Sequence, residues 1–583
     1  MKEEVKSDLQ EALKLCQSSF ATAGFFSIFI NFLMLVPAIY MLQLYDRVIT
    51  SGSQSTLLML TLIMVILLFT MGALEWVRTQ ILVRVSGRLE LLLGKRLYGV
   101  TFKKAILTGG RETSSQPLED LASLRQFLTG NGLFAFFDAP WLPIYIAVMF
   151  MFHEWFGWMA IGTAIILIIF AFINEKITNE TLKEANALSF SGKEMVNKNL
   201  RNAEVVESMG MISGIRERWL VGVNKILFLQ AKASSGSGTV TSITKTLRMV
   251  SQSLVLGLGA YLVILQEITP GLMIAGSILL GRALAPIDLM IGTWKSFVNA
   301  RGSYSRLNKV LLEVAEDKEK MALPEPVGAI SANNLMLAPP GGTKPFVVGV
   351  TFSLNPGESL GIVGPSAAGK STLSRALLGI WPALNGKVRL DGVDIYEWSR
   401  EELGPSIGYL PQDIELFDGT ISENISRFGS MDSEKVVAAA KLADVHEMIL
   451  GLPEGYDTVI GTVSGVLSGG QRQRIGLARA VYGDPKLILL DEPNSNLDEN
   501  GEAALARALE ALKLKNTTVI VVTHRPGILS VLDKLLIMDK GAMTAFGPRQ
   551  EVINQLKQQM QPAVKPQKSG RVGSSTPTVP PVF

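Results

Sequence analysis

The chain has 583 residues, a formal net charge of +3 and 48% hydrophobic residues. Its length exceeds one ordinary domain, and its charge is too small for a nucleic-acid-binding protein, in which lysines and arginines gather on one face. The single cysteine, Cys16, excludes an intrachain disulfide and a cysteine-based zinc site. Apolar stretches of about 20 residues, enough to cross a ~30 Å hydrocarbon core, occur only before residue 292. The first half is therefore predicted to be a membrane domain and the second half soluble.

Residues 1–20 are expected to form an amphipathic interfacial helix that leads into the first membrane span. Apolar residues recur there at helical spacing between charged ones, for example Leu9, Ala12 and Cys16. A cleaved signal peptide has a basic start and a short apolar centre, which this segment lacks. It also leaves no room for another domain before the first span.

Six helical spans are predicted within residues 21–312. They lie near residues 21–44, 56–76, 138–153, 155–174, 247–265 and 270–291. The third is short, although residues 134–137 extend it, and Asp138-Ala139-Pro140-Trp141 interrupts its apolar pattern near the start.

Two long segments, 77–137 and 175–246, separate these spans and carry many lysines and arginines, whereas the short connections carry little beyond Arg47. The positive-inside rule places both long segments, the N-terminus and the soluble half in the cytoplasm. Apolar residues recur at helical spacing in the long segments, so we expect the membrane helices to continue through them.

Arg282 is predicted to lie past the middle of the bilayer, about 18 Å from Pro270 at ~1.5 Å per residue. A charge at that depth costs at least ~2.5–3.5 kcal/mol, so it needs a partner or a water-filled path. Two interpretations stay open: a structural ion pair with Asp288 or Glu75, and a place in the lining of a transport path.

Charged residues followed by Pro324 and Pro326 mark residues 313–326 as a linker. Residues 561–583 combine proline with Ser, Thr and Gly, so this tail is expected to be disordered. The domain between them, residues 327–560, is predicted to be an α/β nucleotide-binding domain from the motifs that follow.

A complete phosphate-binding loop connects the apolar strand 359–363 to a helix that begins at Lys370. Its residues are Gly364, Pro365, Ser366, Ala367, Ala368, Gly369, Lys370 and Ser371, followed by Thr372. Strand, loop and helix in this order are the context that the motif requires, and the glycines let main-chain amides converge on phosphates at a helix N-terminus. Lys370 is expected to reach the β and γ phosphates of ATP, and Ser371 to bind Mg²⁺.

The apolar strand Leu487–Leu490 ends in Asp491 and Glu492. Phosphoryl transfer needs positioning and charge neutralisation, so Asp491 is expected to orient Mg²⁺ and Glu492 to polarise the attacking water.

With Leu467-Ser468-Gly469-Gly470-Gln471 and His524 further along, residues 327–560 resemble the ATP-binding cassette (ABC) ATPases. With six spans before them, the resemblance implies an ABC exporter with a helical transmembrane domain and an α/β P-loop ATPase domain. It implies a catalytic Gln412 that also touches Mg²⁺, a switch histidine at His524, and a loop ending in Asp498 that crosses a dimer interface.

Ser468, Gly469, Gly470 and Gln471 begin a second helix whose N-terminus suits phosphate. One chain does not easily bring both helix ends to one ATP, and the resemblance implies a head-to-tail dimer that shares two nucleotides. Since both half-sites look intact, a homodimer is expected.

Two stretches depart from the family pattern. Leu337-Ala338-Pro339-Pro340 stands where an aromatic residue often stacks on adenine, which leaves Phe346 as the nearest candidate. Thr462-Val463-Ser464 precedes the signature where many exporters carry an acidic residue, so the contact with the membrane domain is expected to differ in detail.

In exporters of this family, short coupling helices in the long cytoplasmic segments press on the ATPase. The resemblance puts them near Ser115–Leu121 and Asn202–Gly210, although loops packed only on their own helices are the alternative.

Three membrane phrases, 137–143, 202–211 and 281–286, resemble the inner-membrane ATPases of type I secretion that export proteases and lipases. This implies unfolded polypeptide cargo with a C-terminal signal, membrane lipid around the spans, a periplasmic adaptor and an outer-membrane channel. The alternatives are a lipid or drug exporter and a membrane protein whose cassette only senses nucleotide. Alternating access and a continuous channel are both open as the route of transport.

Overall fold

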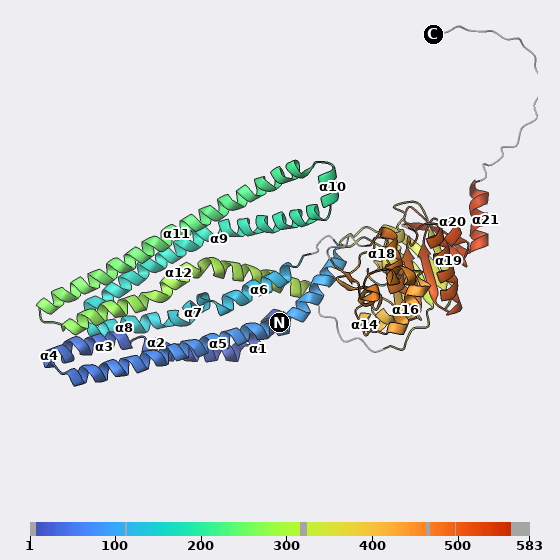
Figure 1. The fold of residues 1–583 in the computed structure, drawn as a ribbon. Helices are drawn as coiled ribbons and strands as arrows, with labels where there is room; N and C mark the ends of the chain where they lie inside the picture. Colours follow the sequence, from blue (N-terminus) through green and yellow to red (C-terminus); the bar gives the residue numbers. More distant parts are fainter. Residues whose placement is uncertain (1–6, 111–113, 315–322, 462–466, 496, 561–583) are drawn as a thin grey trace, which may run out of the picture. The chain divides into compact units, whose positions relative to one another are not determined.

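The structure, a computed structural model, describes residues 7–110, 114–314, 323–461, 467–495 and 497–560 (Figure 1). The chain divides into two compact units, one of residues 1–105 and 112–315, the other of residues 106–111 and 316–583. The division at residue 315 falls inside the segment 313–326 expected as a linker. Residues 315–322 and the expected tail, 561–583, lie outside the described residues.

The first unit is helical (Figure 1). Its helices are α1 (Asp8–Leu15), α2 (Gln17–Leu33), α3 (Val36–Gln43), α4 (Ile49–Ser51), α5 (Gln54–Leu107), α6 (Gln116–Thr129), α7 (Asn131–Asp138), α8 (Leu142–Phe152), α9 (Glu154–Leu200), α10 (Ala203–Ser208), α11 (Ile212–Ile264) and α12 (Pro270–Glu313). A π-helical turn, Leu44–Val48, joins α3 to α4, and a 3₁₀ turn, Ala139–Trp141, joins α7 to α8.

The six predicted spans are confirmed by six helical segments that are long and apolar enough to cross a membrane. These are Gln17–Ser51, Gln54–Leu107, Gly132–Phe152, Glu154–Leu200, Ile212–Ile264 and Pro270–Glu313. Four of them have 44 residues or more, about 66 Å at 1.5 Å per residue, which is twice the hydrocarbon thickness. The membrane helices therefore continue far beyond the bilayer, as their periodicity predicts.

The third span includes the extension expected at residues 134–137 and begins at Gly132. The predicted interruption is real but small. Asp138 ends α7, and Ala139–Trp141 form one 3₁₀ turn before α8 continues. Proline is tolerated in the first positions of a helix. Pro140 in this turn therefore interrupts the α-helix only briefly and does not end the span.

The two expected coupling segments differ in structure. Residues 203–208 form the short helix α10, whose side chains are mostly exposed. Residues 115–121, in contrast, belong to the N-terminal part of the 14-residue helix α6. There Asp120 is buried and accepts hydrogen bonds of 2.9 Å from Ser303 and Arg306 of α12. This segment is thus held by the membrane domain's own last helix.

The apolar face of α1 is covered by protein. Leu9 and Cys16 have no exposed surface, and they share a hydrophobic cluster with Leu89 and Leu93 of α5 and Leu307 of α12. The apolar stripe is therefore buried by neighbouring helices, and the interfacial position expected for residues 1–20 stays a prediction.

The second unit is built on a ten-stranded mixed sheet with strand order β5-β4-β1-β2-β12-β11-β3-β10-β9-β6. Its strands are β1 (Ile330–Leu337), β2 (Val347–Leu354), β3 (Ser359–Val363), β4 (Asn385–Leu390), β5 (Val393–Asp394), β6 (Ile407–Leu410), β9 (Leu487–Asp491), β10 (Thr518–Val522), β11 (Lys534–Asp539) and β12 (Ala542–Pro548). A separate pair consists of β7 (Gly419–Thr420) and β8 (Val459–Ile460).

Helices cover this sheet. They are α13 (Lys370–Leu377), α14 (Arg400–Leu403), α15 (Ile421–Ile425), α16 (Ser433–Leu442), α17 (His446–Leu450), α18 (Gly469–Val481), α19 (Glu499–Leu514), α20 (Pro526–Leu529) and α21 (Arg549–Met560). Strands β9 and β10 are buried along their whole length, as expected for apolar parallel strands covered on both faces. The predicted α/β class is therefore confirmed.

Candidate functional site

The predicted catalytic residues follow the carboxyl ends of four adjacent parallel strands, β3, β10, β9 and β6. The register pairs Val522 of β10 with Ile362 of β3 and with Asp491 of β9, and it pairs Leu410 of β6 with Leu490 of β9. The phosphate loop, His524, Glu492 and Gln412 come directly after these strand ends. In parallel sheets, ligands bind beyond the carboxyl ends of the strands, so the sheet brings the four motifs to one edge.

Two glycines give the phosphate loop its shape. Gly369 has a φ of +97°, and a Cβ there would lie 2.6 Å from Val347 Cγ2. At Gly364, a Cβ would lie 2.3 Å from the carbonyl oxygen of Met538. The first position needs a left-handed conformation and the second needs close main-chain approach, so a larger side chain at either would displace the loop.

Lys370, Ser371 and Thr372 form the first turn of α13, at the end of the loop. The Lys370 ammonium donates to the carbonyl oxygens of Gly364 and Pro365, at 2.8 and 3.0 Å. Between these two loop residues and Lys370 lie Ser366, Ala367 and Ala368, and Ala367 adopts a left-handed φ of +62°. The Lys370 side chain therefore lies against the phosphate loop, where it is expected to bind the ATP phosphates.

Asp491 lies beside this first turn. Ser371 donates a hydrogen bond to its carboxylate, and Lys370 and Arg375 are near enough to act on it electrostatically. Burial raises the pKa of Asp491 above its ordinary value; the Ser371 hydrogen bond lowers it and the Glu492 charge raises it further. A buried, ionisable oxygen ligand next to a hydroxyl is an arrangement that a bound cation would stabilise.

Glu492 and Gln412 meet at the end of the sheet. Gln412 Nε2 donates to Glu492 Oε2 at 3.2 Å, although the two residues are 80 positions apart. Glu492 has a φ of +50°, and its main-chain N–H donates to the carbonyl of Val522 at 2.9 Å. Such a left-handed conformation is strained for a residue with a side chain, and here it turns the carboxylate toward Gln412.

Three residues that the sequence analysis missed support this strand end. The buried side chain of Gln473, from α18, donates to the carbonyl of Pro493 next to Glu492. Thr523 Oγ donates to Asn494 Oδ1 at 3.1 Å, and both residues are buried. Gln473 thus joins the loop after Glu492 to the signature helix α18, and the hydrogen bond between Thr523 and Asn494 joins the same loop to the segment before His524. Their polarity within apolar surroundings was the only available signal.

His524 and Phe346 are two exposed members of the predicted site. His524 follows β10 directly and forms no hydrogen bond or ion pair with any residue that the structure describes. Phe346 is 42% exposed, and its Cε1 lies 3.5 Å from the position of a Cβ on Gly369. Its ring is therefore close to the phosphate loop, as a residue that contacts the nucleotide must be.

The signature residues form the N-terminus of α18. Ser468 is its N-cap: Ser468 Oγ accepts from the Gln471 N–H at 3.3 Å, while Gln471 Oε1 accepts from the Ser468 N–H at 2.8 Å. Gly469 and Gly470 begin the helix. Among the described residues, no hydrogen bond or ion pair joins this helix end to the phosphate loop of the same chain. Residues 462–466, which include Thr462-Val463-Ser464, lie outside the described part of the chain.

Asp498 has a structural contact within its own chain. Its carboxylate accepts from the Gly501 N–H at 2.9 Å as the N-cap of α19, and it pairs with Arg474 of α18 at 3.3 Å. It is exposed, and among the described residues no hydrogen bond or ion pair joins it to the phosphate loop. Its role at a nucleotide stays a prediction. Asn496 lies outside the described residues.

The donor set fits Mg²⁺, which prefers oxygen ligands and completes its shell with phosphate oxygens and water. The hydroxyl of Ser371 and the carboxylate of Asp491 are hydrogen-bonded to each other, so two oxygen donors already lie together beside the phosphate loop. The amide of Gln412 adds a third polar group through its contact with Glu492.

The membrane unit contains a buried polar network between three spans. Arg78 of α5 pairs with Asp138 of α7 at 3.2 Å, and the two side chains are only 5% and 13% exposed. Arg78 also donates to Ser27 at 2.9 Å, and Asn31 donates to Asp138 at 2.8 Å. Tyr145 of α8 donates to the Asn31 side chain at 2.9 Å. The 3₁₀ turn thus follows directly after Asp138, whose carboxylate belongs to a network that connects three spans.

Asp138→Ala is expected to destabilise the membrane unit by ~3–5 kcal/mol, because it leaves the Arg78 charge buried without its partner. The double variant Arg78→Leu/Asp138→Ala should lose less, since it removes both charges. Thermal unfolding of the purified protein in detergent would measure both. Equal melting temperatures for the single variant and the wild type would contradict this interpretation of the network.

Arg282 does not form the ion pair that the sequence analysis considered. Asp288 pairs instead with Arg248 of α11, at 2.8 Å. Within the described residues Arg282 pairs with neither Asp288 nor Glu75, and its side chain is exposed. A structural ion pair with either carboxylate is therefore wrong, and a position on a transport path stays a prediction.

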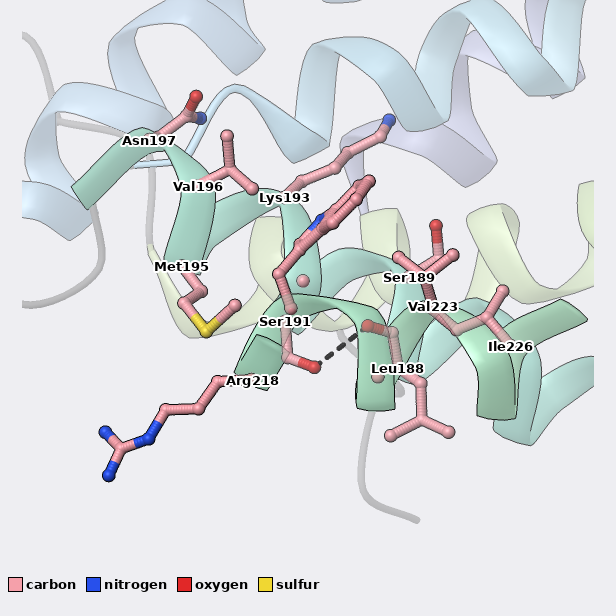
Figure 2. Close-up of a pocket in the computed structure, with 13 residues that line it drawn as sticks. Leu188, Ser189, Ser191, Lys193, Met195, Val196, Asn197, Arg218, Val223 and Ile226 are labelled. Carbon is pink, nitrogen blue, oxygen red and sulfur yellow. Dashed lines mark hydrogen bonds between the residues drawn. The ribbon is translucent and has the colours of Figure 1, made fainter. Parts of the chain in front are cut away.

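A groove of about 560 Å³ lies between α9 and α11, toward α10 (Figure 2). Gly192 and Gly222 line it and face open space, because a Cβ at either would meet no atom within 4 Å. Figure 2 shows the side chains of Lys193 and Arg218 extending in opposite directions from it. The hairpin therefore exposes a mixed apolar and basic surface near its short connecting helix.

Both halves of the chain match known families. Residues 347–495 match the ABC transporter family, and residues 20–284 match the ABC transporter transmembrane region. The structure of a bacterial Atm1-family ABC exporter with ATP bound is similar in fold, with a TM-score of 0.80 over 94% of this chain and 99% of that one. At 21% sequence identity, this likeness concerns the fold alone.

Two relatives are similar over most of the chain. The type I secretion system ATP-binding protein PrsD of Rhizobium meliloti (strain 1021) is 42% identical over 551 residues, which cover 94% of this chain and 95% of the relative. The leukotoxin translocation ATP-binding protein LktB of Mannheimia haemolytica is 29% identical over 536 residues, covering 90% of this chain and 75% of the relative.

Proposed function

Because the chain belongs to the ABC transporters, we propose that it uses ATP hydrolysis to export polypeptides across the inner membrane as the ATPase of a type I secretion system. The observation that carries the proposal is the 42% identity to PrsD, which extends through the membrane helices as well as the ATPase. The cargo is proposed to be an unfolded protease- or lipase-like polypeptide with a C-terminal signal.

The residues at the strand ends divide the hydrolysis between them. The loop from Gly364 to Ser371 would hold the phosphates, with Lys370 on the β and γ phosphates. Glu492, oriented by Gln412, would polarise the attacking water, and His524 would lie near the γ phosphate. Mg²⁺, held by Ser371, Asp491 and Gln412, supplies charge neutralisation when bound. Phe346 would contact the adenine.

We propose that two copies of the chain form the working unit. Ser468, Gly469, Gly470 and Gln471 at the start of α18, together with Asp498 at the start of α19, would complete the ATP site of the partner copy, since among the described residues neither helix start is bonded to the phosphate loop of its own chain. Both ATPase domains and the N-terminus would be cytoplasmic. Moving the cassettes from 1:99 to 99:1 in favour of closure needs ~5.5 kcal/mol of differential binding, which two shared nucleotides would provide.

A periplasmic adaptor and an outer-membrane channel are the further proposed partners. Type I secretion implies both, and the short connections between the spans, such as residues 52–53 and 265–269, would leave little of this chain on the periplasmic side of the bilayer. The α9–α11 hairpin and its short helix α10 would carry the motion of the cassettes to the membrane spans.

Turnover in lipid nanodiscs is expected to respond to a polypeptide that carries a C-terminal secretion signal. A cargo that binds one conformation preferentially shifts the conformational equilibrium, so ATP turnover should change at least about twofold at saturating cargo. The same polypeptide without its signal is the control. A response to lipids or drugs, with none to the signal-bearing polypeptide, would favour the lipid or drug exporter instead.

A further inference from the structure

Arg427 forms an unusually complete set of main-chain hydrogen bonds in the ATPase unit. It follows α15 and has a φ of +60°. All five N–H donors of a guanidinium are used, each on a different carbonyl oxygen. Nε donates to Arg479 at 2.9 Å, Nη1 to Gly404 at 3.0 Å and Ile407 at 2.9 Å, and Nη2 to Ala480 at 3.0 Å and Tyr482 at 3.1 Å.

The charge of Arg427 is balanced by these carbonyls. Within the described residues, no carboxylate pairs with it. Three of its acceptors lie at the C-terminus of α18, where carbonyls lack helical partners and carry the negative end of the helix dipole. Burial, with a smaller effect of the nearby Arg479 charge, lowers the pKa of Arg427 to about 10, so the side chain is still a cation at neutral pH.

Of the other two acceptors, Ile407 begins β6, the strand that leads to Gln412, and Gly404 begins the 3₁₀ turn just before that strand. Helix and strand touch here: a Cβ on Gly408 would lie 2.2 Å from the carbonyl oxygen of Ala480. The segment after Gln412 is tied to the same helix end, because Arg479 donates to the carbonyl of Glu415 at 3.2 Å and lies 5.3 Å from the ring centre of Phe417.

We propose that Arg427 is a positioning residue for ATP hydrolysis, which holds the end of the signature helix α18 against the strand that carries Gln412. The 13 residues of α18 form a rod about 20 Å long. If the Ser468 end of α18 moved, Gln412 would therefore move with it. Glu492 would be affected in turn, through the 3.2 Å hydrogen bond that it accepts from Gln412. The inference rests on the proposed roles of Ser468, Gln412 and Glu492 at the shared ATP.

Arg427→Lys separates this role from mere folding. Lysine keeps the positive charge but has three donors on a compact ammonium, so it cannot bridge the two sets of carbonyls as the planar guanidinium does. The phosphate loop belongs to other strands and is not touched by Arg427. In full-length protein, at a temperature where the melting curve shows the variant to be folded, kcat should fall at least about tenfold. KM for Mg-ATP should change less than about threefold.

Two further variants make the test decisive. Arg507→Lys, on the exposed face of α19, is the matched control and should leave kcat unchanged. Gly408→Ala pushes the strand away from the helix end without altering Arg427, so it should repeat the loss of kcat, and it replaces Arg427→Lys if that variant does not fold.

The proposal is overturned if the folded variants at positions 427 and 408 keep the wild-type kcat. It is also overturned if kcat, nucleotide affinity and melting temperature fall together, since that pattern indicates a structural role alone. A Glu492→Gln protein that turns over ATP at the wild-type rate would instead refute the proposed site, so the two failures are distinguishable.

Discussion

Glu492→Gln is expected to lower ATP turnover by roughly 10²–10⁴-fold, the range that a positioned general base contributes. Glutamine has nearly the same shape, so it keeps a side chain within reach of Gln412, but it cannot accept the proton of the attacking water. ATP binding should survive because the phosphate loop is unchanged. Steady-state phosphate release by the purified full-length protein measures the first effect, and Mg-ATP binding measures the second.

Glu434→Gln is the matched control for this substitution. Glu434 is an exposed glutamate in the first turn of α16, away from the four strand ends, and its replacement should leave turnover within about twofold of the wild type. Wild-type turnover by Glu492→Gln would remove Glu492 as the base, whatever the control shows.

Mixing two inactive variants is expected to restore ATPase activity, since each ATP site is proposed to use two chains. Lys370→Ala destroys the phosphate half of the site, and Ser468→Arg blocks the signature half. Each variant alone should lose nearly all turnover. In a mixed dimer both defects fall in one site and the other site is intact, so co-produced variants should recover a substantial fraction of the activity, on the order of a quarter, of the wild type.

The Ser468 variant also removes a helix cap, which costs about 0.5–2 kcal/mol. Asp432→Arg, which removes the N-cap of α16, controls for that loss and should remain active. No recovery in a sample where mixed dimers are demonstrated by two affinity tags would contradict the shared sites.

The local motifs were predictable from the sequence because their chemistry depends on adjacent residues. The phosphate loop needs glycines at fixed positions and a strand before it, and the structure puts Gly369 at a left-handed φ as required. Asp491 ends the fully buried strand β9 and Glu492 follows it, and apolar runs of that kind are recognisable without any tertiary information. The six spans were predictable for the same reason.

The contacts between distant segments were not predictable. Gln412 reaches Glu492 across 80 positions, and Gln473 reaches the carbonyl of Pro493 only because α18 packs under that loop. The stripe on α1 has the same pattern whether it faces lipid or protein, and only the fold shows that α5 and α12 cover it. Asp288 was matched to Arg282 by sequence proximity, whereas packing of α11 on α12 gives it Arg248.

Secretion of a reporter with a C-terminal signal tests the central claim most directly, in bacterial cells that produce this protein with its adaptor and outer-membrane channel. The account predicts that the reporter reaches the medium with the wild-type chain and stays in the cell with Lys370→Ala or Glu492→Gln, at equal levels of membrane-inserted protein. Secretion that is the same with all three chains would contradict ATP-driven polypeptide export by this protein.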